Sequence, residues 1–299
     1  MITSPLSNAA NGRLQRRIAA GFFGVLLSIG TAASAPKPEN IPDFAPSPDV
    51  GWIAYGTDFL SPASGPGPVL SDPKHPFIPD RVEYAAAQPD LKIPGASTFR
   101  VADLSNPILQ PWAREELRKV NERVLGGRPG YTRQTACWPN GVPGYLLYPV
   151  QPIFFVQGPK EVVMLTQFDH MVRHVYLNVP HSARVKPSWH GESVGHYEGD
   201  TLIVDTIGLN DKTYVDNYRT PHTDKLHVIE RYHLIEGGKT MQVDVHVEDP
   251  GAFTQGWNAI QRYRRVAPGP IIEMNCAENN PNYFHHDVEA MPESSKPDF

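Results

Sequence analysis

The sequence is poor in features that mark a definite class of protein. It has only two cysteines among 299 residues, Cys137 and Cys276. Neither lies in a CxxC pair or near a set of histidine ligands, which argues against a structural zinc site. No nucleotide-binding, phosphate-binding or metal-binding motif is recognisable either. We therefore expect no cofactor and no bound metal.

The chain also lacks an excess of positive charge. Lysine and arginine total 27, against 32 aspartates and glutamates. Removal of the first 35 residues takes away three arginines, so the mature charge is 24 − 32 = −8. This balance disfavours nucleic acid and anionic membrane surfaces as partners. The remaining length suits one domain, and the sequence leaves formation of a homo-oligomer open.

Long apolar runs are confined to the N-terminus. Arg13, Arg16 and Arg17 precede an apolar stretch at 18–29, and small residues end at Ala35. This order is typical of a secretory signal peptide over 1–35, with cleavage after Ala35. The protein is therefore expected in the periplasm or outside the cell. An uncleaved membrane anchor is the alternative, although the run is short for one.

In an oxidising compartment, the two cysteines suggest one disulfide between Cys137 and Cys276. Such a link would close a loop of about 140 residues and stabilise the fold by roughly 4–5 kcal/mol. The alternative is two unpaired buried thiols.

The chain divides into three parts by composition. A proline-rich, extended wrap over 36–105 follows the signal segment, and 106–299 forms a helix plus barrel domain with a C-terminal tail. The only helix expected is Pro111–Leu125, because Pro111 suits its first position and glycines follow its end. Its apolar residues form one stripe, with Glu115 and Lys119 as an i,i+4 pair outside.

From residue 146 to 266 the sequence reads as consecutive strands with no helical period between them. Two-residue turns are expected at Gly199-Asp200 and Gly237-Gly238. About eight antiparallel strands and one helix predict a mainly β protein with an up-and-down, lipocalin-like barrel. A β-sandwich is the alternative. The expected strands are 146–156, 161–168, 172–178, 195–198, 201–206, 226–235, 240–247 and 258–266.

The segment 189–206 supports two competing interpretations. Gly191, Ser193 and Gly195 match the G-x-S-x-G pattern of serine hydrolases. However, a nucleophile elbow needs a helix after the serine, and here a Gly turn and a β-branched strand follow. The β interpretation is favoured, and a hydrolase using Ser193 is kept as an alternative.

Several motifs resemble those of a large, mostly uncharacterised family of secreted bacterial proteins. Residues 137–143 are similar to its C-x-P-x-G-x-P opening, and residues 189–206 to its W-x-G-x-S-x-G-x-x-x-G-D-T-L-x-V-D-T signature. Residues 178–181 depart from the Asp-Gly-Arg-like turn expected there. The resemblance implies a secreted, β-rich domain like a lipocalin barrel, and no particular activity. Further matches are Pro221-His222-Thr223, Glu230-Arg231, Asp249-Pro250 and residues 276–280.

The candidate catalytic set consists of polar residues in these motifs: His222, Glu230, Asp205, Arg231 and Asp249. His222 would be the general acid or base, with Asp205 or Glu230 orienting it or acting as the base. Arg231 would hold an anionic or phenolate oxygen. Structural alternatives exist, since Glu230 and Arg231 can form a cross-strand ion-pair element and Asp249 can cap a turn.

A second set would line a ligand site. Core packing is the alternative for its aromatic members. His174 does not form a metal site with His170, because on a strand the two stand about 13 Å apart. The set is Trp189, Tyr197, Tyr232, Trp257, Tyr263 and His174.

The leading hypothesis is a cofactor-independent, periplasmic acid/base enzyme of the lyase or isomerase type. Its substrate would be a small hydrophobic molecule, aromatic in character. A non-enzymatic binding protein for such a ligand is the first alternative, and the serine hydrolase is the second.

Overall fold

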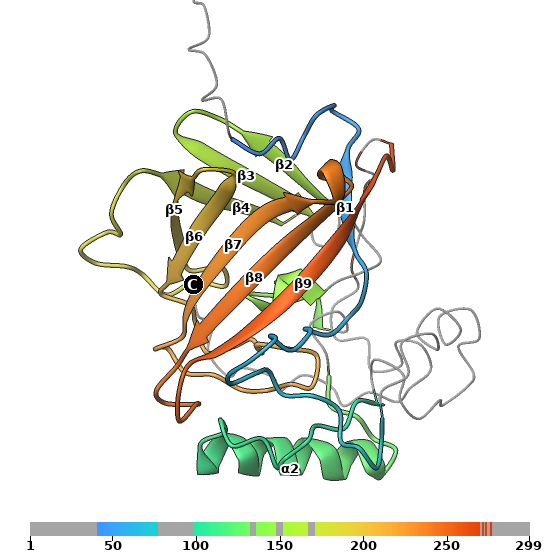
Figure 1. Ribbon diagram of the computed structural model, residues 1–299. Coiled ribbons are helices and arrows are strands. Elements are labelled where there is room, and N and C mark those ends of the chain that lie inside the picture. Colours follow the sequence, from blue (N-terminus) through green and yellow to red (C-terminus); the bar gives the residue numbers. More distant parts are fainter. Residues whose placement is uncertain are drawn as a thin grey trace, which may run out of the picture. The chain divides into compact units, whose positions relative to one another are not determined.

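The computed structural model describes residues 41–76, 99–131, 136–147, 152–166 and 171–269, together with Ile271, Glu273 and Cys276. The expected signal segment and His170 lie outside these residues. The described chain forms a closed barrel of nine strands with one α-helix, α2 (Pro111–Leu125) (Figure 1). The strands are β1 (Gly51–Ala54), β2 (Ile153–Gln157), β3 (Glu161–Thr166), β4 (Val172–Leu177), β5 (Glu192–Glu198), β6 (Thr201–Ile207), β7 (His227–Ile235), β8 (Thr240–Glu248) and β9 (Trp257–Val266).

The barrel confirms the predicted fold class, and eight of its strands correspond to the eight expected segments. The ninth, β1, lies within the proline-rich wrap and closes the barrel between β2 and β9. It is only four residues long, too short for a recognisable alternation. Part of the first expected strand is instead a 3₁₀ helix, η2 (Gly144–Leu147), all of whose residues are buried.

Strand direction differs from the expectation at one place. β4 and β5 run parallel, with Val175 opposite Ser193, while every other neighbouring pair is antiparallel. The connection between them covers residues 178–191. A parallel pair needs a crossover of a dozen residues or more, and this connection is long enough to supply it.

The expected hairpin turns both occur, one with a different length. Gly199-Asp200 is a two-residue turn between Glu198 and Thr201. The turn at Gly237-Gly238 spans four residues, because Ile235 pairs with Thr240 and a 3₁₀ helix, η4 (Glu236–Gly238), lies between them.

Alternation along the strands decides which side chains face inward. β4 alternates strictly, so Arg173 and Val175 are buried while His174 and Tyr176 are exposed. β8 presents Val243, Val245 and Val247 to the interior, while the intervening Gln242, Asp244 and His246 are partly exposed. The valine-rich face thus belongs to the core.

Two segments outside the sheet fill the interior. Phe44, from the wrap, is fully buried, and its ring lies 5.0 Å from that of Phe155 and 6.3 Å from that of Tyr232. Its carbonyl accepts a hydrogen bond from Trp52 Nε1 at 2.8 Å. Tyr145, in η2, reaches the same interior, where its hydroxyl meets that of Tyr232.

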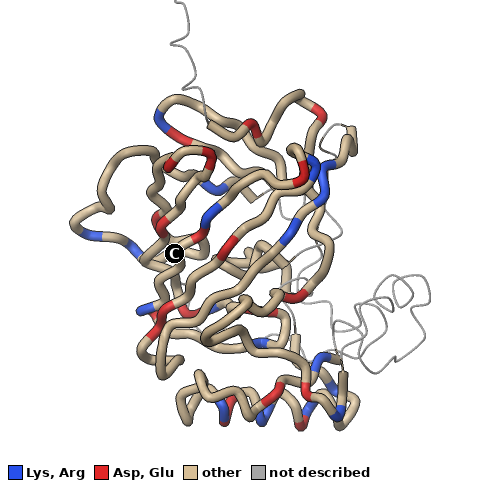
Figure 2. The backbone as a smooth tube through the Cα atoms, viewed as in Figure 1, with Lys and Arg blue, Asp and Glu red and all other residues tan. Residues whose placement is uncertain are grey.

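Helix α2 lies across one end of the barrel (Figure 1). It has Pro at its start and buries the predicted stripe. The Trp112 indole donates to the Gly251 carbonyl, which ties the helix to the loop after β8. Acidic and basic residues intermix along its outer face (Figure 2). The expected Glu115–Lys119 pair is replaced by Arg118 with Glu115 and Glu122, and by Lys119 with Glu116.

The predicted disulfide joins Cys137 to Cys276 across a sequence separation of 139, with Cα atoms 5.7 Å apart. A disulfide of this kind persists in oxidising compartments. Among the described helices, none is both long and apolar enough to cross a membrane.

Candidate functional site

The barrel interior contains an ion pair between Arg173 on β4 and Glu230 on β7. Both side chains are almost fully buried, with 4% and 0% of their surface exposed. The contact is bidentate, because Arg173 Nη2 lies 2.5 Å from Glu230 Oε2 and Nη1 lies 3.1 Å from Oε1. Such a fork-to-fork geometry fixes both side chains in place.

Two phenols complete the environment of the carboxylate. Tyr145 from η2 donates to Glu230 Oε1 at 2.9 Å, and Tyr232 from β7 donates to the same oxygen at 2.7 Å. The Tyr145 hydroxyl also accepts a hydrogen bond from Arg173 Nη1 at 2.6 Å. The guanidinium lies over the Tyr145 ring, 4.9 Å from its centroid, in cation–π geometry.

Two hydroxyls satisfy the remaining donors of Arg173. Its Nε donates to Ser193 Oγ at 3.1 Å and its Nη2 to Thr206 Oγ1 at 2.8 Å. Ser193 lies within β5 and is followed by the turn and β6, so the strand–turn–helix of a nucleophile elbow is absent there. Its hydroxyl also lies 2.9 Å from Thr206 Oγ1. The buried residues Arg173, Glu230, Tyr145, Tyr232, Ser193 and Thr206 are called the interior cluster below.

Burial controls the ionisation of this cluster. Burial is the main cause that raises the pKa of Tyr145, and the nearby Glu230 carboxylate adds to it. Burial, followed by Glu230, likewise raises the pKa of Tyr232. Burial is the largest single influence on the pKa of Arg173 and lowers it, but Glu230, Tyr145 and Tyr232 together outweigh burial, so the net pKa is raised. Both phenols therefore keep their protons at neutral pH and act as hydrogen-bond donors.

The five expected catalytic residues do not come together. Only Glu230 belongs to the interior cluster. Arg231 is half exposed and lies 3.7 Å from Glu198. Asp205 is outside the barrel, where it accepts from His181 and His227 at 3.0 and 2.9 Å.

The other two members of that set lie in the loops beside the barrel strands. His222 is buried, with Nε2 2.9 Å from Thr213 Oγ1 and Nδ1 2.9 Å from the Thr223 carbonyl. Asp249 is also buried and accepts from the backbone N–H and hydroxyl of Thr223, at 2.6 and 2.7 Å. It also accepts from the N–H of Gly251 at 2.9 Å, so it caps the turn after β8. This is the structural role that the sequence offered as the alternative to catalysis.

The expected ligand-binding residues divide between interior and surface. Tyr232, Trp257 and Tyr263 are fully buried, and partly buried Tyr197 accepts from Gln157 at 2.9 Å. His174 is on the outer face, 3.2 Å from Glu161.

Trp189 also lies apart from the interior cluster. Its ring is 5.4 Å from that of Trp138, and Lys212 Nζ lies 5.8 Å from its centroid.

Sequence reasoning did not select Arg173, Tyr145 or Thr206. The strict alternation of β4 carried a signal for Arg173, since it shares a face with Val175. Nothing comparable marked Tyr145, which reaches the interior through the 3₁₀ helix. In the part of the chain that is described, no group of three or more His, Cys, Asp or Glu could hold a metal ion.

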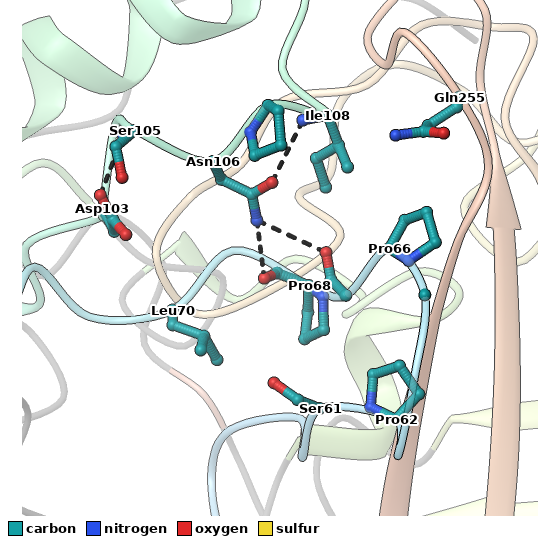
Figure 3. A pocket seen from close by; sticks show the side chains of 13 residues that line it. Ser61, Pro62, Pro66, Pro68, Leu70, Asp103, Ser105, Asn106, Ile108 and Gln255 are labelled. Carbon is teal, nitrogen blue, oxygen red and sulfur yellow. Dashed lines mark hydrogen bonds between the residues drawn. The ribbon is translucent and has the colours of Figure 1, made fainter.

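A separate cleft of about 520 Å³ lies against the wrap (Figure 3). Its walls come from residues 61–70 and 103–108, with Gln255 beside them. Asn106 holds the two walls together by donating to the Pro68 carbonyl at 2.9 Å. Asp103 is the only charged residue of its lining, and none of the candidate catalytic or ligand-binding residues takes part.

Comparisons with protein-family models, with curated proteins and with solved structures gave no match for this chain.

Proposed function

We propose that the protein is an acid/base enzyme that acts on a small hydrophobic, aromatic molecule at the interior cluster. The observation that carries this proposal is the buried Arg173–Glu230 pair, with the Tyr145 and Tyr232 hydroxyls on one carboxylate oxygen. Strongly perturbed ionisable groups gathered in one buried place are characteristic of functional sites.

Stability alone is a weak reason to keep such a pair. Replacing a buried ion pair with apolar residues of similar volume is often neutral or stabilising, by about 1–4 kcal/mol. The neighbouring interior residues Phe155, Met164 and Val175 are apolar. A charged cluster at that place therefore favours a chemical role.

The chemistry would be a proton transfer with rearrangement or cleavage, as in an isomerase or a lyase. When substrate binds, the hydroxyls of Tyr145 and Tyr232 would turn from Glu230 Oε1, to which they donate in this structure, and donate instead to a substrate oxygen on which negative charge develops. Glu230 and Arg173 would hold these phenols in position. The reaction would use only side chains of this chain, and the protein's binding partner would be the small molecule.

The aromatic character of the substrate is supported by the surroundings of Tyr232. The rings of Phe44 and Phe155 lie 6.3 and 6.0 Å from that of Tyr232, so aromatic side chains surround this end of the cluster, and aromatic groups pack favourably against one another. The N-terminal segment and the Cys137–Cys276 disulfide support a periplasmic or secreted location.

A second candidate is a binding protein without catalysis. It is favoured by the completeness of the cluster, since all three guanidinium nitrogens of Arg173 have partners within the protein. A fully satisfied network is rigid and keeps its groups in fixed positions, which suits binding more than proton transfer.

Hydrogen exchange in D₂O separates the two candidates. We expect the protein to catalyse deuterium incorporation into 2-tetralone, 2-indanone or phenylacetone, measured by mass spectrometry. Tyr145→Phe and Tyr232→Phe should each lower the rate by about 10- to 1,000-fold. The upper part of this range is typical for the loss of one oxyanion donor. Tyr176→Phe, on the exposed face of β4, should leave it unchanged.

Calorimetry with the same ketones measures binding and so tests the second candidate. Saturable binding without exchange would establish the binding protein in place of the enzyme. If the protein shows no exchange and no binding, both candidates are overturned.

A further inference from the structure

His190 directly precedes the segment that enters the interior cluster. Gly191, its neighbour, packs so closely on β6 that an added Cβ would lie 3.1 Å from Thr206 Cγ2. Ser193, three residues after His190, contacts both Arg173 and Thr206. His190 is thus next to the strand that carries Ser193, and the positive charge of Arg173 acts on its imidazole.

One ring nitrogen of His190 is buried without a hydrogen-bond partner. In the described chain, Nε2 is shut off from solvent and contacts no donor or acceptor, although the residue as a whole is partly exposed. By contrast, both ring nitrogens of His181 and His222 have partners. A buried polar atom left unpaired destabilises the fold, so its presence calls for an explanation.

The electrostatic surroundings keep this ring neutral. Burial, followed by the positive charge of Arg173, lowers the pKa of His190 to about 4. At pH 7 the imidazole therefore has one N–H and one lone pair. With the proton on Nδ1, the lone pair on Nε2 is free to accept a proton inside the protein.

We propose that His190 Nε2 is the proton acceptor of this site, and that the substrate is a small aromatic carbonyl compound with an acidic α-hydrogen. This inference rests on the proposed acid/base function. Loss of an α-hydrogen from a carbonyl compound places the negative charge on the carbonyl oxygen, and this is the proton that the imidazole would take. The clustered hydroxyls and phenols then hold the oxygen that gains negative charge.

The step balances without another reactant. The lone pair of His190 Nε2 takes the α-proton, the C–H bond breaks, and its electron pair forms the enolate. The imidazolium returns the proton to a different carbon in an isomerisation. In a lyase reaction the enolate expels a β-substituent, which takes the proton as it leaves. Either course restores neutral His190.

The test compares His190→Asn with His196→Asn, a change at an exposed histidine on β5. Exchange of deuterium from D₂O into 2-tetralone should fall about 100- to 10,000-fold in H190N, the range for loss of a general base. Binding of 2-tetralone, measured by calorimetry, should persist in H190N. H196N should match the native protein in both. Native exchange in H190N would overturn the role of His190.

A second readout keeps this inference separate from the proposed function. Imidazole ¹⁵N spectra of the native protein, with His190 assigned through H190N, should show the Nε2 signal shifting when 2-tetralone is added. If the native protein catalyses no exchange but the signal shifts, the enzyme proposal fails while His190 still contacts the ligand. An unshifted signal in the presence of saturating ketone contradicts the inference whatever the activity.

Discussion

Arg173 and Glu230 meet across the barrel interior in two parallel contacts, 2.5 Å from Nη2 to Oε2 and 3.1 Å from Nη1 to Oε1. They belong to β4 and β7, which are not neighbours in the sheet. The pair therefore links two sides of the barrel through its centre. Tyr145 connects η2 to the same pair, because its hydroxyl donates to Glu230.

Removing one partner of this pair should be costly. Glu230→Gln leaves the Arg173 cation buried without its counter-ion, so we expect a loss of about 3–5 kcal/mol in the free energy of unfolding. Urea denaturation at pH 7 measures this loss. The matched change Arg231→Gln affects the next residue, which is half exposed, and should stay within about 0.5 kcal/mol. Equal losses for the two variants would contradict the central role of the pair.

Two glycines with the same backbone conformation should differ in their tolerance of alanine. Gly191 and Gly199 have φ of +63° and +59°, but an added Cβ at Gly191 would lie 2.4 Å from the Ile207 carbonyl oxygen, whereas Gly199 faces open space. We expect Gly199→Ala to lose about 1–2 kcal/mol from the left-handed backbone alone. Gly191→Ala should lose about 1–3 kcal/mol more through overpacking. Thermal and urea unfolding of both variants measure the difference, and similar losses would refute it.

Asp216 should give the protein a pH-dependent stability. Burial raises its pKa to about 6, from 3.8 in the unfolded chain. The folded carboxyl thus holds its proton more tightly, so its contribution is fully present below pH 3.8 and is lost as the pH rises through 6. Asp216→Asn should gain stability over the native protein across that window, by about 3 kcal/mol at most.

The amide at position 216 can keep the two backbone contacts of Oδ1, while the Thr220 hydroxyl, which donates to Oδ2 at 2.7 Å in the native protein, would accept from the amide nitrogen instead. Asp216 Oδ1 accepts from the N–H groups of Tyr218 and Thr220 at 2.9 and 3.1 Å, and the amide oxygen of asparagine accepts in the same way. Asp211→Asn, at an exposed position, is the control and should show no such window. Unfolding curves from pH 4 to pH 8 measure the stability difference between D216N and the native protein. A difference that does not change with pH would contradict the raised pKa of the buried Asp216 carboxyl.

The disulfide should be a large single contributor to stability. Replacing Cys137 and Cys276 together with serine releases a loop with a sequence separation of 139. We expect a loss of about 4–5 kcal/mol by loop entropy. A reducing agent should destabilise the native protein by a similar amount and leave the double variant unchanged. A native protein insensitive to complete reduction would contradict this prediction.

The sequence was sufficient for the elements whose signals are local. Pro111 and the glycines after Leu125 marked both ends of α2, and the two expected hairpin turns were found. β1 could not be recognised, because its four residues pair with β9, more than two hundred positions away in the chain. The parallel pairing of β4 and β5 likewise depends on where the connecting chain crosses.

The candidate site was only partly predictable for the same reason. Glu230 was selected, and its inward direction follows from its alternation with Arg231. Its partners Tyr145 and Arg173 come from other elements, and only barrel closure brings them together. Asp205 and Arg231 occur in the same motifs but face outward, since neighbouring positions on a strand point to opposite sides.

The pairing of β1 with both β2 and β9 has a consequence for biogenesis. A strand that emerges early from the ribosome has its main partner at the far end of the described chain. The cylinder cannot close until synthesis has delivered β9, so the nascent protein carries unsatisfied strand edges until then. A fold with such distant partners is intrinsically slow to form. Folding can therefore be completed only when synthesis of the described chain is nearly finished.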